Sequence, residues 1–83
     1  MNYAGNQERL KRLWKDVVVS VDSSENIIAV KTIPGNAQAL ASLIDNSGIK
    51  EIIGTVAGDD TIFVLVKPKN KVNAILTKFQ QMS

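Results

Sequence analysis

Hydrophobic residues along the chain follow two patterns, β-branched runs and apolar residues at helical spacing. The β-branched runs predict four strands, at residues 17–21, 27–33, 52–56 and 61–66. Turn-forming residues 22–26 join the first two strands into a hairpin, and residues 57–60 join the last two. Gly54 weakens the third strand slightly, because glycine contributes no side chain to pack.

Helical spacing appears in two segments, one after each hairpin. The apolar residues of the first are Ala37, Leu40, Ala41 and Ile44, and those of the second are Val72, Ile75, Leu76 and Phe79. Pro34 and Gly35 stop the preceding strand, and Asn36 is placed to cap the first helix. Gly48 ends that helix by supplying a left-handed residue. The predicted order is ββαββα.

This order predicts an α+β domain in which two helices cover one face of a four-stranded, largely antiparallel sheet. In the fourth strand nearly every residue from Ile62 to Val66 is apolar, whereas a strand with one solvated face would alternate. A central position in the sheet is one explanation, and coverage of both faces is the other. Since no further segment is predicted to cover the second face, we expect self-association into a closed symmetric assembly.

The first fifteen residues form a lead into this domain. Residues 1–7 are small and polar, and we expect them to be frayed or to come from a linker. Leu10, Leu13 and Trp14 recur at helical spacing among charged residues, which predicts a short amphipathic turn. Its basic residues are either solvated charges beside a packed lead-in or a patch that contacts DNA.

Composition narrows the class of protein. The length of 83 residues allows one small domain, and 45% hydrophobic residues is high for so small an interior, which again favours assembly. The net charge of +2 is too small by itself to imply binding to nucleic acids or membranes. The absence of cysteine and histidine excludes disulfides, thiolate catalysis and most transition-metal sites. There is no signal peptide and no apolar run of membrane-spanning length, so we expect a soluble, cytoplasmic protein.

The first candidate site is the pair Asp59 and Asp60, at the tip of the second predicted hairpin. Adjacent carboxylates repel each other, so keeping both ionised in a crowded site requires a positive partner. A metal ion, a lysine or arginine side chain, or a cationic ligand would serve. Gly58 before them suggests a turn that needs a positive φ and displays the aspartates outward. A plain solvated turn is the alternative, because Gly-Asp is a common turn dipeptide.

Gln38 and Asp45 are a second candidate pair, on the first predicted helix. They share a face about 10 Å apart along the helix axis, which is close to the reach of an extended arginine. Glutamine offers a donor and an acceptor to an amino-acid ligand, and aspartate accepts from an ammonium or guanidinium group. Spacing alone favours two polar residues on a solvated face. Near the second helix, three lysines either pair with acidic groups of a neighbour or remain solvated: Lys67, Lys69 and Lys71.

Three segments resemble the C-terminal domain of the bacterial arginine repressor family. They are residues 34–38 (PGNAQ), 43–45 (LID) and 54–62 (GTVAGDDTI), and the resemblance covers about residues 16–79. It implies a ββαββα domain that forms trimers and hexamers, with L-arginine bound between trimers. It also implies that residues 1–15 are an interdomain linker remnant and residues 16–83 an arginine-binding and oligomerisation domain.

Carried over position by position, the resemblance implies that Asp59 and Asp60 bind L-arginine, with at least one of them reaching into a site on the opposing trimer. It implies further contacts from Gln38, Asp45, Thr55 and Ala57, the last through its backbone. It implies no catalytic residue, no metal and no cofactor. In this family L-arginine is a corepressor, and an N-terminal winged helix-turn-helix domain, to which nothing in this chain corresponds, binds operator DNA.

Two other classes of function stay open. A metal-dependent enzyme would use Asp59, Asp60 and Asp45 as oxygen ligands for magnesium or calcium, although the chain shows no nucleophile with an activating base. A structural oligomerisation module would bind no ligand. Gln38 and Asp45 discriminate between these functions. A metal site has little use for the glutamine, and a structural module has little use for either residue.

Overall fold

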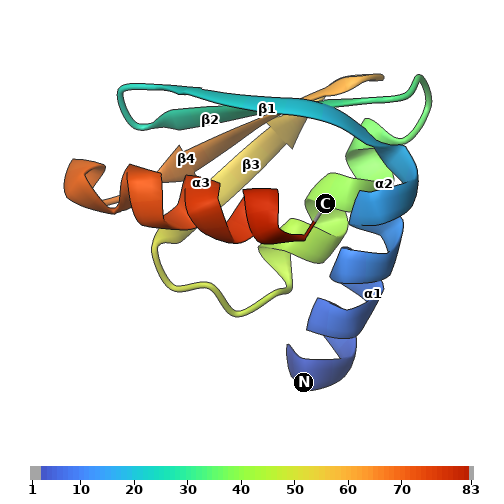
Figure 1. Cartoon of the computed structure of the whole chain (residues 1–83), viewed down its shortest axis with the longest axis horizontal. Coiled ribbons are helices and arrows are strands. Elements are labelled where there is room, and N and C mark those ends of the chain that lie inside the picture. The colour runs from blue at the N-terminus through green and yellow to red at the C-terminus, as the bar shows by residue number, and fades with distance from the viewer. Residues whose placement is uncertain (1–2, 83) are drawn as a thin grey trace.

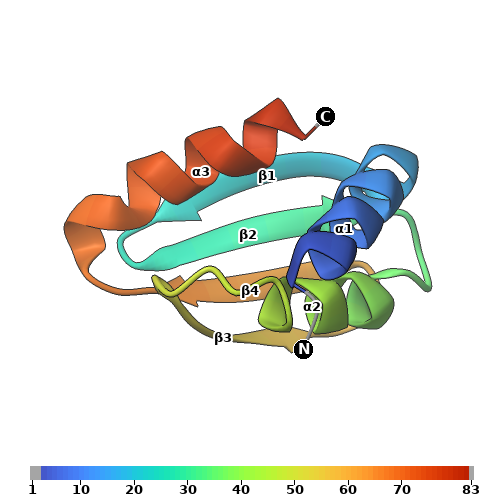
Figure 2. The same cartoon turned by 90° about the horizontal axis from the view of Figure 1, so that it is seen from below.

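The fold is a single antiparallel sheet with helices on one face. The computed structural model describes residues 3–82, with the side chains of residues 5–82. Its elements are α1 (Tyr3–Val17), β1 (Val18–Ser24), β2 (Ile27–Thr32), α2 (Ala37–Asp45), β3 (Ile52–Ala57), β4 (Thr61–Val66), the 3-10 helix η1 (Lys69–Lys71) and α3 (Val72–Gln81). The strands pair in the order β1-β2-β4-β3, and α1, α2 and α3 lie on the same face (Figures 1 and 2). The predicted α+β class and antiparallel sheet are confirmed, with three α-helices in place of two.

The additional helix is α1, where the sequence predicts only a short turn after a frayed segment. Residues 1 and 2 lie outside the described part of the chain, but the helix begins at Tyr3, so the prediction of a frayed lead is wrong for the residues that follow. Asn6 and Gln7 donate side-chain hydrogen bonds to backbone carbonyls just after α2. These polar residues therefore hold α1 to the end of α2, a tertiary contact that helical spacing does not reveal.

The hydrophobic core lies between the sheet and the helices. From α1, Trp14 packs its ring on that of Phe79 in α3, with the ring centroids 4.8 Å apart. The two central strands bury alternate residues: Ile28, Val30, Ile62, Val64 and Val66. The helical faces predicted for α2 and α3 are buried as expected, except that Leu76 is half-buried. Spacing therefore predicted which residues of α2 and α3 face the sheet.

Both hairpins are confirmed, and the first is tighter than predicted. β1 and β2 stay paired as far as Ser24 and Ile27, so the turn consists of Glu25 and Asn26 alone. Glu25 takes a positive φ of 53° there. Residues 22–24 form strand rather than turn, because cross-strand pairing outweighs their local turn preference.

The glycines differ from the prediction at one position. Gly48 has a φ of 79°, as predicted for the residue that ends a helix, and Gly35 has a φ of 86°. Gly58 is not among the positive-φ glycines of residues 3–82, so that prediction is wrong. The connection closes instead through a hydrogen bond of 2.9 Å from the Gly58 N–H to the Thr61 carbonyl. Gly54 follows a register shift in β3, where a strand bulge tolerates a glycine.

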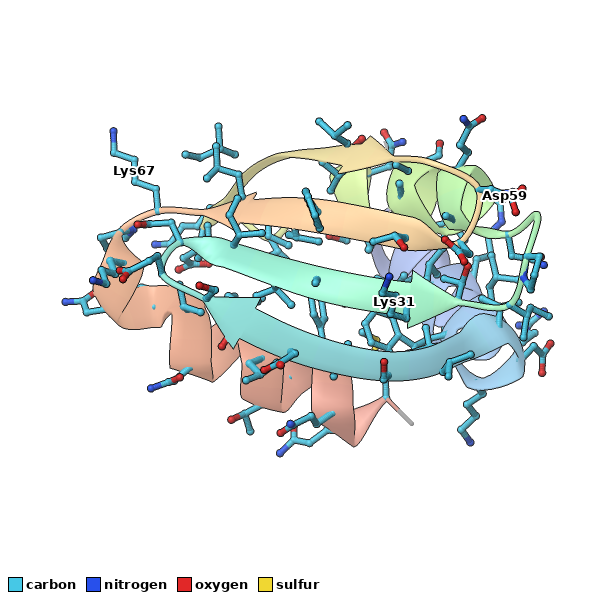
Figure 3. All side chains as sticks on the ribbon, turned by 90° about the horizontal axis from the view of Figure 1, so that it is seen from above. Lys31, Asp59 and Lys67 are labelled. Carbon is cyan, nitrogen blue, oxygen red and sulfur yellow. The ribbon has the colours of Figure 1, made fainter. Side chains whose placement is uncertain are left out.

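The face of the sheet opposite the helices carries an exposed apolar patch. Figure 3 looks onto this face. The cross-strand registers align Val56, Phe63 and Ala29 in one row, and Leu65 with Ile27 in the next. Val56, Phe63 and Leu65 are 75%, 53% and 39% exposed. The central position of β4 therefore does not cover its outer face, which favours the predicted self-association.

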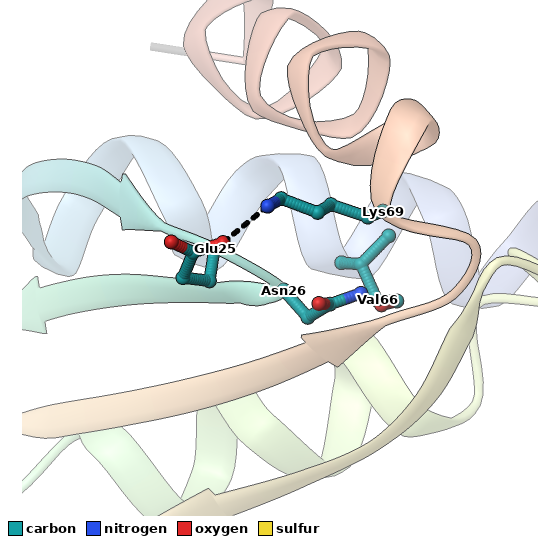
Figure 4. A network of polar contacts seen from close by, with 4 residues as sticks. All are labelled: Glu25, Asn26, Val66 and Lys69. Carbon is teal, nitrogen blue, oxygen red and sulfur yellow. Dashed lines mark hydrogen bonds and ion pairs between the residues drawn. The ribbon is translucent and has the colours of Figure 1, made fainter.

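Polar contacts join the first hairpin turn to the end of β4 (Figure 4). Asn26 Nδ2 donates to the Val66 carbonyl at 2.9 Å, and the Val66 N–H donates back to the Asn26 carbonyl at 2.9 Å. Lys69 forms an ion pair with Glu25, in which both side chains are largely exposed. Lys69 therefore has an acidic partner within its own chain.

Candidate functional site

The tip of the second hairpin lies against the start of α2. The backbone carbonyl of Asp59 accepts hydrogen bonds from the N–H groups of Gly35 (3.1 Å) and Ala37 (3.2 Å). The carbonyl of Asp60 accepts another from the Thr32 N–H (2.8 Å). The first N–H groups of a helix have no hydrogen-bond partner within the helix. The Asp59 carbonyl at the hairpin tip therefore supplies a partner for the Ala37 N–H at the start of α2.

Asn36 occupies the N-cap position of α2, as predicted, but its side chain makes no capping hydrogen bond. Its Nδ2 donates instead to the carbonyl of Pro34, at 3.1 Å. The prediction of a side-chain cap is wrong, because the Asp59 carbonyl binds the start of the helix from a distant part of the chain.

Gln38 and Asp59 line one open hollow beside the hairpin tip. The hollow has a volume of about 300 Å³, and Gly35 and Gly58 form the rest of its lining. Both polar side chains are exposed, and Figure 3 shows Asp59 next to α2. Two predicted site residues from different elements are thus brought together. An amide and a carboxylate at this position can bind the polar groups of an amino acid.

Asp60 has different surroundings from its neighbour Asp59. It does not line the hollow, and its carboxylate accepts a hydrogen bond of 2.9 Å from the Thr61 hydroxyl. The Thr61 hydroxyl in turn accepts one of 3.0 Å from the Lys31 ammonium. A lysine therefore supplies positive charge on the Asp60 side of the pair, whereas Asp59 lines the hollow.

Asp45 lies at the opposite end of α2 from Gln38. The Thr55 hydroxyl donates to the Asp45 carboxylate and is 3.0 Å from each of its oxygens. Asp45 is exposed, whereas Thr55 is half-buried in β3. Ala57 follows two residues later on the same face of that edge strand and is also half-buried. The predicted site residues therefore extend along the flank formed by α2 and β3 and do not form one compact cluster.

The sequence match agrees with this fold and this flank. Residues 14–81 match the family described as the C-terminal domain of the arginine repressor. The chain belongs to this family. An arginine repressor from Pelotomaculum thermopropionicum is 57% identical to this chain over 77 residues, and one from Desulfitobacterium hafniense is 53% identical over 75 residues. These alignments cover 93% and 90% of this chain but 51% and 50% of those proteins, so the chain spans about half the length of the curated relatives it matches.

Membership of the arginine repressor family bears on the rival functions. Repressors are transcriptional regulators and not enzymes, so the metal-dependent enzyme loses its support. Across residues 3–82 no group of three or more acidic, histidine or cysteine side chains is arranged to hold a metal ion. In that same range no helix is long and apolar enough to cross a membrane.

Two features of the site could not be predicted from the sequence. Gly35 lines the hollow, although its Pro-Gly pair indicates only the end of a strand and the resemblance of residues 34–38 implies no ligand contact from it. Lys31 reaches the Asp60 side through Thr61, because the β2–β4 register pairs Lys31 with Thr61. No local motif carries that second signal, since thirty residues separate the two in the chain.

Proposed function

We propose that this domain senses L-arginine as the corepressor of a transcriptional regulator and assembles that regulator through trimers into a hexamer. The observation that carries the proposal is the convergence of Gln38 and Asp59 on one open hollow in a member of the arginine repressor family. In this proposal residues 1–15 derive from the interdomain linker, with Leu10 and Trp14 of that segment packed into the domain core, and residues 16–83 form the sensing domain. A winged helix-turn-helix domain N-terminal to this chain binds operator DNA, and the regulator acts in the cytoplasm.

The flank of α2 and β3 offers chemistry that suits L-arginine. A guanidinium is planar, permanently charged and able to donate two parallel hydrogen bonds to a carboxylate, so Asp59 and Asp60 favour arginine over lysine or neutral citrulline. The amide of Gln38 has a donor and an acceptor for the α-carboxylate and α-amino groups. The remaining contacts come from Asp45, Thr55 and the backbone of Ala57. The hydroxyl that lies 3.0 Å from both Asp45 oxygens supports this, because it fixes the carboxylate in position.

A second subunit is needed to complete the site. Small-molecule sites bury most of the ligand surface, whereas four residues of one chain line this open hollow of about 300 Å³. An opposing subunit that presents its own Asp59 or Asp60 would cover the ligand. The openness of the hollow therefore supports a site between two trimers, with at least one aspartate reaching across.

The exposed sheet face supports assembly. Val56, Phe63 and Leu65 present apolar surface there, and removing such surface from water is favourable by about 25 cal/mol per Å². This contribution does not depend on a ligand. A structural oligomerisation module that binds no arginine is therefore the second candidate function.

Charge couples the ligand to the assembly. Asp59 and Asp60 are exposed, so facing subunits bring like charges together in the empty hexamer. Bound arginine neutralises and cross-links these carboxylates, and thereby tightens or rotates the two trimers. By linkage, if arginine raises the affinity for operator DNA, operator DNA raises the affinity for arginine by the same factor.

Calorimetry with L-arginine, L-lysine and L-citrulline tests the proposal, alongside sedimentation to report the assembly size. We expect saturable heat with L-arginine only, together with a stable hexamer. A hydrogen bond to a charged group is worth about 1.5–3 kcal/mol, so Asp59→Asn and Asp60→Asn should each weaken arginine binding roughly tenfold or more.

Asp16→Asn is the matched control, because Asp16 is an exposed carboxylate at the end of α1 that does not line the hollow. This variant should bind L-arginine as the wild type does. A folded oligomer that gives no arginine heat, or unchanged arginine coupling in both Asp59→Asn and Asp60→Asn, would refute the sensing role and favour the structural module.

A further inference from the structure

A crevice lies between α1 and the C-terminal end of α3, which adjoin in Figures 1 and 2. It consists of two hollows of about 410 and 400 Å³ that share the residues Lys11, Gln81 and Met82. We call it the α1–α3 crevice. Its charged lining is four cations and one carboxylate: Lys11, Arg12, Lys15, Lys78 and Glu8. The crevice is therefore strongly basic.

The crevice accounts for the net charge of the chain. α1 and Lys78 together carry five cations and two carboxylates, whereas the remaining residues carry five cations and six carboxylates. The net charge of +2 is thus the sum of a basic end and a slightly acidic remainder. In the described part of the chain, the four crevice cations are all exposed and none of them forms an ion pair. Their charge is therefore available to a ligand.

We propose that the α1–α3 crevice binds the phosphate backbone of duplex DNA without reading its bases. The proposal rests on the proposed function, in which another domain of the same regulator holds operator DNA. Lysine and arginine side chains that contact phosphates supply most of non-specific affinity and carry no sequence information. Lys11 and Lys15 are one helical turn apart, about 6 Å along the axis, so they form a line of charge along α1.

The surroundings of these cations favour DNA over a membrane or a small molecule. The apolar residues of the lining are Leu10, Met82 and Ile49. They are buried or half-buried, so none of them projects to enter a lipid layer. Four cations and one carboxylate spread over two adjoining hollows suit the row of phosphates on an extended polyanion better than one small ligand. Local rather than total charge governs electrostatic binding, which is why the net charge alone predicted no DNA contact.

The test measures binding of this chain to a short labelled duplex of arbitrary sequence by fluorescence anisotropy at increasing salt. Four phosphate contacts predict a slope of about −3.6 for log K against log salt concentration. Neutralising three of the cations together should flatten that slope by about 2.7 and weaken binding at low salt at least about tenfold. The crevice variant carries Lys11→Gln, Lys15→Gln and Lys78→Gln.

A matched control variant removes the same charge elsewhere. It carries Lys67→Gln, Lys69→Gln and Lys71→Gln, three exposed lysines before α3, at its other end from the crevice. We expect it to keep most of the wild-type affinity and slope. Equal losses in the two variants, no binding by the wild-type chain, or equal binding to phosphatidylglycerol vesicles that DNA cannot displace would each overturn the proposal.

Arginine calorimetry separates this proposal from the sensing role. The crevice variant should give the wild-type arginine heat, because the crevice and the hollow beside Asp59 share no lining residue. Loss of DNA binding with arginine heat retained supports the crevice as a separate site. If the wild-type chain binds DNA but gives no arginine heat, the sensing proposal is refuted and the crevice proposal stands. If it gives arginine heat but does not bind DNA, the crevice proposal is refuted and the sensing proposal stands.

Discussion

Replacing Trp14 by alanine tests whether α1 is part of the domain core or a detachable lead. The Trp14 side chain has no solvent exposure, and its ring lies 4.8 Å from that of Phe79, so it joins α1 to α3. A linker remnant would contribute little to the stability of the domain. A core helix would contribute through the burial of this ring.

The structure gives the size of the expected effect. Truncating a fully buried tryptophan to alanine costs about 3–5 kcal/mol, which combines lost transfer free energy with the cavity left behind. About 0.5–1.5 kcal/mol is expected from the geometry of an aromatic pair such as Trp14 and Phe79. A chain of 83 residues has a total stability of about 4–12 kcal/mol. Trp14→Ala should therefore remove a large part of the free energy of unfolding.

Urea unfolding followed by far-ultraviolet circular dichroism measures this loss. Fluorescence is unsuitable, because Trp14 is the single tryptophan of the chain. Protein concentration is kept constant, since self-association adds stability that depends on it. Lys15→Ala, at an exposed neighbouring position, is the control and should change stability by no more than about 0.5 kcal/mol. A loss below about 1 kcal/mol for Trp14→Ala would refute the assignment of α1 to the core.

Single substitutions at four other positions should have smaller effects. Gly35→Ala should cost about 1–2 kcal/mol through its positive φ alone, because nothing lies within 4 Å of the added Cβ. Ser47→Ala should cost about 1 kcal/mol, because the buried hydroxyl donates to a carbonyl of α2 at 2.7 Å. Lys69→Gln should cost less than about 1 kcal/mol, since its ion pair with Glu25 is exposed. Val56→Asp should leave the subunit folded but reduce its assembly size, because Val56 is exposed on the apolar sheet face.

Thermal melts check the first three variants, and sedimentation checks the fourth. A stabilising Gly35→Ala would contradict the positive φ, and a neutral Ser47→Ala would contradict the buried hydrogen bond. A loss of several kcal/mol in Lys69→Gln would mean that the pair is not screened by water. An unchanged assembly in Val56→Asp would exclude the apolar sheet face as the contact.

The regular elements could be predicted because their signals are local. Leu40 and Ile44 share a helical face whatever surrounds them, and the alternation of Ile62 and Val64 follows from the two-residue period of a strand. α1 could not be predicted at its full length, because Asn6 and Gln7 are held by carbonyls near residue 46. Residues 22–24 became strand for the same reason, since their partners lie in β2.

The candidate site could likewise be predicted only in part. Asp59, Asp60 and Gln38 could be predicted as residues with suitable chemistry, because their types and the segments that resemble the family are visible in the chain. The sequence could not show that Asp59 shares a hollow with Gln38 whereas Asp60 bonds Thr61. That difference arises from the hydrogen bonds that dock the hairpin tip on the start of α2.

Residue types and short spacings are enough to predict the class of the fold, the family and the residues that carry charge. Where those charges meet depends on how the helices and the sheet pack. Lys11 and Lys78 lie far apart in the chain, and they line one crevice because α1 and α3 pack together through Trp14 and Phe79. Packing of buried apolar groups sets the distances between exposed polar ones, and no count of charges along a chain contains those distances.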